Sequence, residues 1–174
     1  MIKRIIYKAK NIYEIPLDFY KDGGFTNILF DFDNTIDSYK AKRLNYKFLE
    51  LTKNLNDLGI KTYVVSNGAK KRLNLIFNSA SETIKYASKL FKPLAKRFDQ
   101  FILKNKIDLS KTLYIGDQFM TDYLLSRKRN ISFILCDRLT NEDQLSTKIN
   151  RIFERRFLKS SKTIIKDYKE IVNG

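Results

Sequence analysis

Two aspartates separated by one residue, Asp31 and Asp33, have the type and spacing best suited to chemistry. The apolar residues 28–30 before them predict a short buried strand, and Asn34 with Thr35 predicts the turn that ends it. Alternate side chains of a strand share a face, so both carboxylates are expected on one face. Such a pair repels unless a cation binds it. We therefore expect a metal ion, with Mg²⁺ preferred; solvated acids at an ordinary strand end are the alternative.

Other polar residues also follow predicted strands. Ser66 comes at the end of one apolar stretch, and Asp117 ends another. The patterns predict five strands, at 28–30, 61–67, 84–87, 111–117 and 131–136. Apolar residues at helical spacing predict helices at 42–58, 70–78, 93–105 and 119–129. Gly59 is expected as a C′ cap, and Pro93 in the first turn of its helix.

The alternation of strands and helices predicts an α/β fold, a doubly wound, Rossmann-like sheet of five parallel strands with helices on both faces. In such sheets ligands bind beyond the carboxyl ends of the strands, where the strand order reverses. Asp31, Ser66 and Asp117 each fall at such an end, so we expect them to gather at one edge of the sheet. Capping of the following helix is the alternative task for Ser66.

The composition restricts the classes of function. The 174 residues suffice for one domain with a sizeable core, and the absence of histidine excludes serine–histidine triads, histidine phosphatases and H-E-x-x-H zinc sites. The single cysteine, Cys136, cannot form an internal disulfide and is expected to be buried. The sequence contains no apolar run of membrane-spanning length and no signal-peptide pattern, so we expect a cytoplasmic protein.

The formal net charge of the chain is +15. Such a charge favours polyanionic partners, either nucleic acid or the anionic inner face of a membrane, to which the protein would bind peripherally. A compositional origin is the alternative, because the chain is rich in Lys, Ile and Asn, as AT-rich coding would produce. The charge alone leaves these alternatives open.

Four motifs follow one another along the chain: DFDNTI at 31–36, Ser66, Lys92 before Pro93, and GDQFMTD at 116–122. In order and character they resemble the motifs of the haloacid dehalogenase (HAD) superfamily of aspartate-nucleophile phosphatases. The resemblance implies that Asp31 attacks phosphorus and that Asp33 acts first as general acid and then as general base. The phosphate-binding residues that it implies are Ser66, Asn67, Lys92 and Thr35.

The resemblance also implies a Mg²⁺ site. Its ligands would be the carboxylates of Asp31 and Asp117 together with the backbone carbonyl of Asp33. Asp122 would orient Lys92 or a metal-bound water from outside the ligand set. A cap domain is expected to be absent, because the segments between the motifs are too short to hold one. The site is therefore expected to be open, which favours large phosphorylated substrates.

A narrower resemblance, which includes the tail, is to the YqeG-type branch of capless (subfamily IIIA) HAD phosphatases. Its most diagnostic part is NEDQLSTKINRIFER at 141–155. This branch includes the mitochondrial phosphatidylglycerophosphate phosphatase of fungi, so the resemblance implies a role in phospholipid metabolism, with a lipid head group as substrate. The expected organisation is a packed lead-in at 1–26, a phosphatase core at 27–140 and a basic helical tail at 141–174.

The chain departs from the branch pattern at two places. Residues 125–130 read LSRKRN where the branch has a Gly-x-Asn-Arg-x-Gly turn, so the roles of Arg127 and Lys128 stay open, although Asn130 can still adopt a left-handed cap. Gly68 replaces a usual Asn, which is expected to loosen the loop after Ser66.

Two other functions remain as alternatives. The first is a nucleic-acid end phosphatase with the same chemistry, which the charge favours and the lack of an evident stacking platform disfavours. The second is a basic RNA- or ribosome-associated protein that keeps the fold without turnover. The oligomeric state and the partner of the basic tail stay open.

Overall fold

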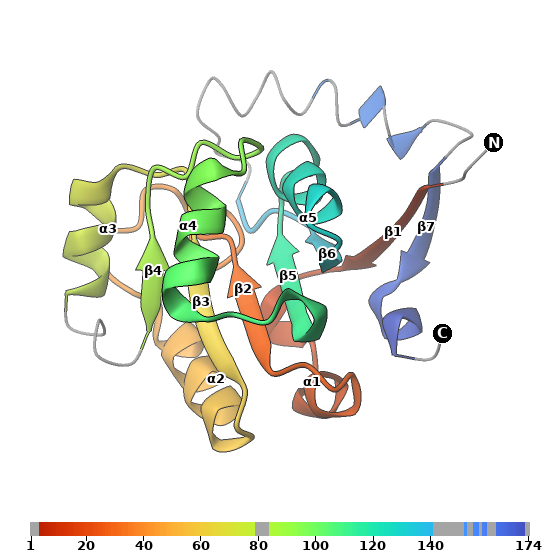
Figure 1. The fold of residues 1–174 in the computed structure, drawn as a ribbon, viewed down its shortest axis with the longest axis horizontal. Coiled ribbons are helices and arrows are strands. Elements are labelled where there is room, and N and C mark those ends of the chain that lie inside the picture. The colour runs from red at the N-terminus through yellow and green to blue at the C-terminus, as the bar shows by residue number, and fades with distance from the viewer. Residues whose placement is uncertain are drawn as a thin grey trace.

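The computed structural model describes residues 4–78, 84–140, 152, 155, 156, 158, 159 and 163–172. Within them, seven strands form one sheet in the order β4-β3-β2-β5-β6-β1-β7, and every neighbouring pair is parallel (Figure 1). The strands are β1 (Arg4–Ala9), β2 (Asn27–Phe30), β3 (Lys61–Val65), β4 (Lys85–Ala87), β5 (Thr112–Gly116), β6 (Ser132–Cys136) and β7 (Thr163–Asp167).

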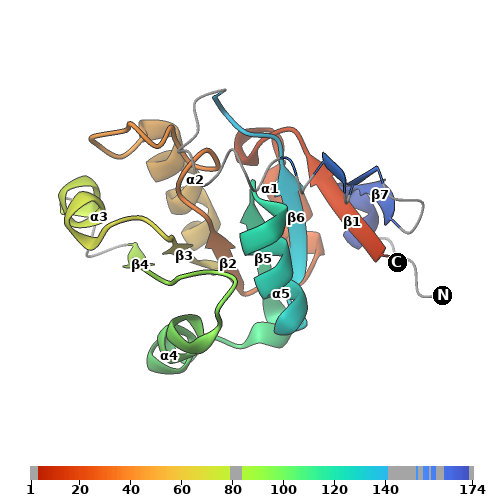
Figure 2. The same cartoon turned by 90° about the horizontal axis from the view of Figure 1, so that it is seen from above.

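Helices cover both faces of the sheet, as Figure 2 shows. One face carries α1 (Leu17–Asp22), α2 (Tyr46–Asp57) and α3 (Lys70–Phe77), and the other carries α4 (Lys96–Asn105) and α5 (Leu124–Lys128). Short 3-10 turns are η1 (Ile12–Glu14), η2 (Leu109–Lys111) and η4 (Tyr168–Ile171), and η3 (Phe119–Tyr123) is a π-helical turn. None of the helices in the described ranges combines the length and apolarity needed to cross a membrane.

The central strand β2 connects two separate cores. Its side chains alternate, so that Ile28 and Phe30 enter the core beneath α1, α2 and α3, while Leu29 enters the core beneath α4 and α5. All three are fully buried, and burial of each such side chain stabilises the fold by about 1.5 to 3 kcal/mol. A strand that is apolar on both faces in this way is what a doubly covered parallel sheet requires.

The α/β class is confirmed, but the sheet has seven strands and not the predicted five. The two additional strands come from the ends of the chain: β1 lies in the lead-in and β7 in the expected helical tail. β1 pairs with β6 and with β7, which lie far away in sequence, so no local turn signal announced it. Residues 141–151, which carry most of the tail motif, lie outside the described ranges.

The predictions for two helix ends are confirmed, and the prediction for one helix start is wrong. Gly59 follows α2 with a φ of 76°, and Asn130 follows α5 with a φ of 53°, so both have the left-handed backbone expected of helix ends. The prediction for Pro93 was wrong, because α4 begins only at Lys96. Lys92 and Pro93 instead form a cis peptide in the loop before the helix.

Candidate active site

Asp31 is held at the carboxyl edge of the sheet although β2 ends one residue before it. Its backbone N–H donates to the carbonyl of Ile115 in β5 (2.9 Å), so the chain still follows the sheet at this point. The residue is 4% exposed, and its Oδ1 accepts a hydrogen bond from Lys92 Nζ (2.6 Å). A buried carboxylate is thus presented at the switch point, between strands whose connections run to opposite faces.

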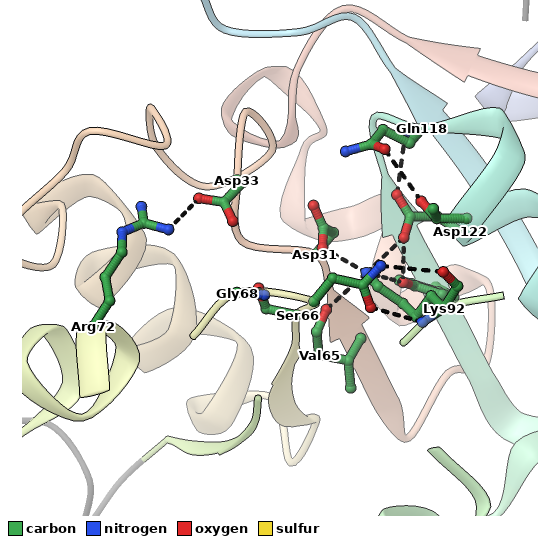
Figure 3. Close-up of polar contacts among 12 residues, drawn as sticks. Asp31, Asp33, Val65, Ser66, Gly68, Arg72, Lys92, Gln118 and Asp122 are labelled. Atoms are coloured by element: carbon green, nitrogen blue, oxygen red, sulfur yellow. Dashed lines mark hydrogen bonds and ion pairs between the residues drawn. The ribbon is translucent and has the colours of Figure 1, made fainter. Parts of the chain in front are cut away.

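Lys92 joins the acids of the site into one network (Figure 3). Its buried ammonium donates to Asp31 Oδ1 (2.6 Å), to Asp122 Oδ1 (2.6 Å) and to the carbonyl of Val65 (3.0 Å). The hydroxyl of Tyr114 lies 2.9 Å from the same nitrogen and itself donates to Asp122 Oδ1 (2.7 Å). Charge-assisted bonds of this kind fix the ammonium beside Asp31.

Asn67 positions Lys92 through the backbone. Its Oδ1 accepts from Lys92 N–H (2.7 Å), and its Nδ2 donates to Lys92 C=O (3.2 Å). Two further bonds join the same loops, from Lys89 N–H to the carbonyl of Gly68 and from Leu90 N–H to the carbonyl of Ser66. Asn67 therefore clamps the lysine loop to the end of β3, while its implied contact with phosphate stays a prediction.

Ser66 is fully buried at the end of β3, and the structure does not use it as a helix cap. Its Oγ accepts from Gly68 N–H (2.9 Å), whereas α3 begins four residues later behind Ala69, which makes no side-chain cap. A Cβ atom at Gly68 would lie 3.0 Å from Ser66 Oγ and 3.5 Å from Asp33 Oδ2. The absence of a side chain at Gly68 therefore leaves room at the meeting point of two predicted site residues.

Asp33 has a partner that the sequence did not suggest. Arg72, in α3, donates from Nη1 to Asp33 Oδ1 (2.6 Å) and from Nη2 to the carbonyl of Ser38 (3.4 Å). The guanidinium carbon also lies 5.3 Å from the centre of the Phe32 ring. Figure 3 shows Asp33 turned toward Arg72, away from the Lys92 network that holds Asp31. Strand alternation does not decide this direction, because β2 ends before both aspartates.

The loop from residue 31 to 37 is fastened from both ends of the chain. The hydroxyl of Tyr13, in η1, donates to the carbonyl of Ile36 (2.6 Å). Asn34, with a φ of 64°, accepts from Leu139 N–H at its carbonyl and from the Thr140 hydroxyl at its side chain (2.8 Å). Asn tolerates this left-handed backbone better than most residues. The loop that carries both aspartates is therefore rigidly supported, and Thr35 is buried within it.

Asp117 and Asp122 approach the site from β5 and the turn that follows it. Asp117 is 1% exposed and comes directly after β5. Asp122 lies in the π-helical turn η3, is fully buried, and also accepts from Gln118 N–H at Oδ2 (3.1 Å). π-Helical turns often mark functional sites, and this one directs Asp122 at Lys92. Asp122 thus contacts Lys92 directly, while its implied task of orienting Lys92 stays a prediction.

Burial and charge act in opposite directions at the centre of the site. Burial raises the pKa of Asp31 well above its usual range; the Lys92 ammonium opposes this rise, and the carboxylates of Asp122, Asp117 and Asp33 add to it. Burial would lower the pKa of Lys92, but the attraction of Asp122 and Asp31 raises it above its ordinary value. The neighbouring carboxylates thus favour the charged form of Lys92, whereas burial disfavours the charged form of Asp31.

The donor set fits a divalent cation. Carboxylate oxygens of Asp31, Asp117 and Asp122 lie within 4.8 Å of one another, and all three residues are buried. Hard oxygen donors of this kind suit Mg²⁺, and a cation would relieve their mutual repulsion. Asp122 already accepts three hydrogen bonds, and the expectation that Asp31 and Asp117 supply the carboxylate ligands stays a prediction.

Comparisons with known proteins relate the chain to a phosphatase. No protein-family model matches the chain. The chain is 29% identical over 154 residues to "Probable phosphatase YqeG" of Bacillus subtilis (strain 168), and the match covers 88% of each chain.

One solved structure shares the fold with a TM-score above 0.5, and a second is similar below that value. A crystal structure of an uncharacterized protein from Listeria monocytogenes serotype 4b is similar with a TM-score of 0.54 and 15% identity, over 71% of this chain and 88% of that one. The 3-deoxy-D-manno-octulosonate 8-phosphate phosphatase of Moraxella catarrhalis, solved with magnesium and phosphate ions and a KDO molecule, has a TM-score of 0.48 and 12% identity, over 79% of this chain and 91% of that one.

Proposed function

We propose that this protein, a phosphatase similar to YqeG and of the HAD type, hydrolyses phosphomonoesters through an aspartyl-phosphate on Asp31, with Mg²⁺ as cofactor and phosphatidylglycerophosphate as substrate. The observation that carries the proposal is the buried network in which Lys92 binds both Asp31 and Asp122 at 2.6 Å. A nucleophilic carboxylate beside a fixed ammonium suits attack on an anionic phosphoryl group.

The first step transfers the phosphoryl group to the enzyme. A carboxylate oxygen of Asp31 forms a bond to phosphorus, and the bond between phosphorus and the ester oxygen breaks. Asp33 donates its proton to the departing oxygen, so the alcohol leaves neutral. Arg72 holds the Asp33 carboxyl in place during this transfer through its 2.6 Å bond. Lys92 offsets the negative charge of the phosphoryl oxygens.

The second step regenerates the enzyme. Asp33, now a carboxylate, takes a proton from a water molecule, whose oxygen attacks phosphorus. The bond between phosphorus and Asp31 breaks, inorganic phosphate leaves, and the Asp31 carboxylate is restored. Asp31, the backbone carbonyl of Asp33 and Asp117 would hold the Mg²⁺ ion. When bound, the ion supplies positive charge that the carboxylate cluster lacks and that phosphoryl transfer requires.

A lipid substrate is supported by the openness of the fold and by charge. In the described residues, the connections from Asp33 to Ser66 and from Ser66 to Lys92 contain α2, α3 and β3–β4 strand segments, with no inserted cap. A substrate embedded in a bilayer needs such an uncovered edge, because a cap would collide with the membrane. The net charge of +15 favours an anionic bilayer.

The test is phosphate release, with Mg²⁺, from phosphatidylglycerophosphate in mixed micelles. 3′-Phosphorylated oligonucleotides and small sugar phosphates are run beside it, with Asp31→Asn as the blank. Preferential turnover of the lipid, lost with EDTA and in the blank, is the expected result. Turnover of oligonucleotides alone would show that the substrate is a nucleic acid and not the lipid. Equal turnover by Asp31→Asn would refute the assignment of Asp31 as the nucleophile.

A further inference from the structure

Two large apolar side chains stand exposed beside the site. Phe91 is 52% exposed and Leu94 is 66% exposed, and they flank the loop residue Lys92, whose side chain is buried in the active-site network. The loop lies between β4 and α4 at the end of the sheet toward which the strand arrows point, beside α5 (Figure 1). Leu90, directly before Phe91, is 2% exposed. The chain therefore turns alternate residues inward and outward at the edge of the site.

The outward position of Phe91 is built into the loop. Lys89 and Phe91 both have a left-handed backbone, with φ angles of 50° and 57°, which bulky residues rarely adopt. This conformation lets Leu90 and Lys92 enter the protein while the Phe91 ring stays outside. The guanidinium of Arg97 lies 4.4 Å from the ring centre and donates to the carbonyl of Lys89 (2.8 Å), which holds the ring in this position.

Exposed cations surround this apolar pair. They come from the loop itself, from the start of α4 and from the end of α5: Lys89, Lys96, Arg97 and Lys128. Lys128 Nζ lies 3.2 Å from the carbonyl of Pro93, so the end of α5 contacts the loop directly. Residues 84–98 and 123–136 contain neither Asp nor Glu. Asp99, in the first turn of α4, is paired with Arg129, so the surface is apolar at its tip and has an excess of positive charge around it.

This combination fits the surface of an anionic bilayer better than a protein. Contact surfaces between proteins are depleted in lysine, whereas lysine and arginine beside Phe and Leu are typical of segments that lie in the membrane interface. Each cation near an anionic surface strengthens binding by about fivefold, and the apolar pair adds specificity for the acyl boundary.

We propose that Phe91 and Leu94 insert into the interface of an anionic bilayer and thereby bring Lys92 and Asp31 to the phosphate of a lipid head group. This inference rests on the proposed lipid substrate and adds the surface by which the enzyme reaches it. The four cations named above contact the anionic head groups around the inserted pair.

A fluorescence experiment tests the insertion directly, because the chain contains no Trp. The full-length variant Phe91→Trp is mixed with vesicles of phosphatidylglycerol and phosphatidylcholine, and with phosphatidylcholine vesicles. The matched control is Leu103→Trp, on the exposed surface of α4 (81% exposed) beyond its first turns. Emission of Phe91→Trp is expected to move to shorter wavelength with anionic vesicles, while Leu103→Trp stays unchanged. No movement, or equal movement in both variants, overturns the proposal.

Co-sedimentation measures the contribution of the pair. Phe91→Ser/Leu94→Ser is expected to bind the anionic vesicles at least about tenfold more weakly than the wild type. Leu75→Ser/Leu103→Ser removes two side chains of similar exposure from α3 and α4 and is expected to bind like the wild type. Equal binding by all three proteins overturns the proposal, and so does a wild type that binds no anionic vesicle, in which case a protein partner accounts for the surface.

Hydrolysis of a small soluble phosphomonoester by the wild type with Mg²⁺, in the absence of vesicles, separates this inference from the proposed function. Hydrolysis without insertion of position 91 leaves the phosphatase proposal standing and removes the docking surface. Insertion without hydrolysis of any phosphomonoester supports the docking surface and removes the proposed function.

Discussion

Replacement of Gly116 by alanine is the sharpest test of how Lys92 is held. A Cβ atom at this position would lie 2.6 Å from Oδ2, 2.7 Å from Cγ and 2.8 Å from Cβ of Asp122. These distances are too short for any real contact, so the Asp122 side chain must move. Asp122 is fully buried and binds Lys92, Tyr114 and the backbone of Gln118, so it cannot move without breaking these bonds.

The expected cost of Gly116→Ala combines overpacking with the loss of charge-assisted hydrogen bonds. Together these effects should lower the free energy of unfolding by about 3 to 5 kcal/mol. Lys92 would lose one of its two carboxylate partners and shift relative to Asp31. A shift of Lys92 by about 1 Å is expected to lower kcat by about 10²-fold. Urea denaturation gives the first quantity, and steady-state turnover of a soluble phosphomonoester gives the second.

Gly24→Ala provides the matched control. Gly24 has a φ of 65°, but a Cβ atom there would meet nothing within 4 Å. This variant carries only the backbone cost of a left-handed alanine, about 1 kcal/mol, and should keep the wild-type kcat. If Gly116→Ala is no less stable than Gly24→Ala and turns over at the wild-type rate, the assignment of Asp122 as the support of Lys92 is refuted.

Three further predictions concern Arg72, Tyr114 and Cys136. Arg72→Ala should lower kcat about tenfold with little change in KM, because it frees the Asp33 carboxyl from its 2.6 Å bond, and Arg72→Lys should recover part of the loss in the same assay. Tyr114→Phe should lower the free energy of unfolding in urea by about 1 to 3 kcal/mol, since it removes a buried hydroxyl from the network, whereas Tyr86→Phe, which loses an exposed bond, should change it by less than about 0.5 kcal/mol. Burial raises the pKa of the Cys136 thiol above its ordinary 9.0, so the native thiol keeps its proton where the unfolded chain releases it. Its contribution to stability should be complete below pH 9 and fall as pH rises above it, and native Cys136 should resist alkylation until urea unfolds the protein.

The sequence predicted the residues whose chemistry depends on local motifs. Asp31 and Asp117 each follow a strand that is apolar on both faces, so the parallel-sheet rule alone placed them at one edge. Their association with Lys92 came from the resemblance, and the structure brings Lys92 to 2.6 Å from Asp31 across 61 positions of sequence. Charge and periodicity contain no information about such a distance.

Arg72 and Tyr114 were missed for the same reason. Arg72 stands 39 positions from Asp33, in a helix where a basic residue suggests only a solvated face. Tyr114 lies in an apolar strand, where its ring suggested core packing, and it does pack beside Phe98 and Phe133. Only the hydroxyl at its tip belongs to the site. A Tyr that ends beside a buried acid can be recognised once the strand order is known, but not from its own sequence neighbours.

The strands at the chain ends were missed because their partners are remote. β1 has an apolar stretch of only a few residues, and its neighbours β6 and β7 lie at the other end of the chain. Short strands of this kind have no hairpin turn to reveal them. The lead-in was expected to pack on the core without forming a strand, and Ile6, Ile12 and Ile15 in it are buried.

The position of β1 between β6 and β7 also governs when the site is completed during synthesis. β1 has no strand partner until residues 132–136 have been made, and its other edge is covered only by residues 163–167. Parallel pairing across such a separation requires closure of a very long loop before any pairing energy is gained. Tyr13, in η1 after β1, donates to the carbonyl of Ile36 in the loop that carries both aspartates, so its docking waits for the pairing of β1. The loop that carries Asp31 and Asp33 therefore gains this support only after residues 132–136 have been made.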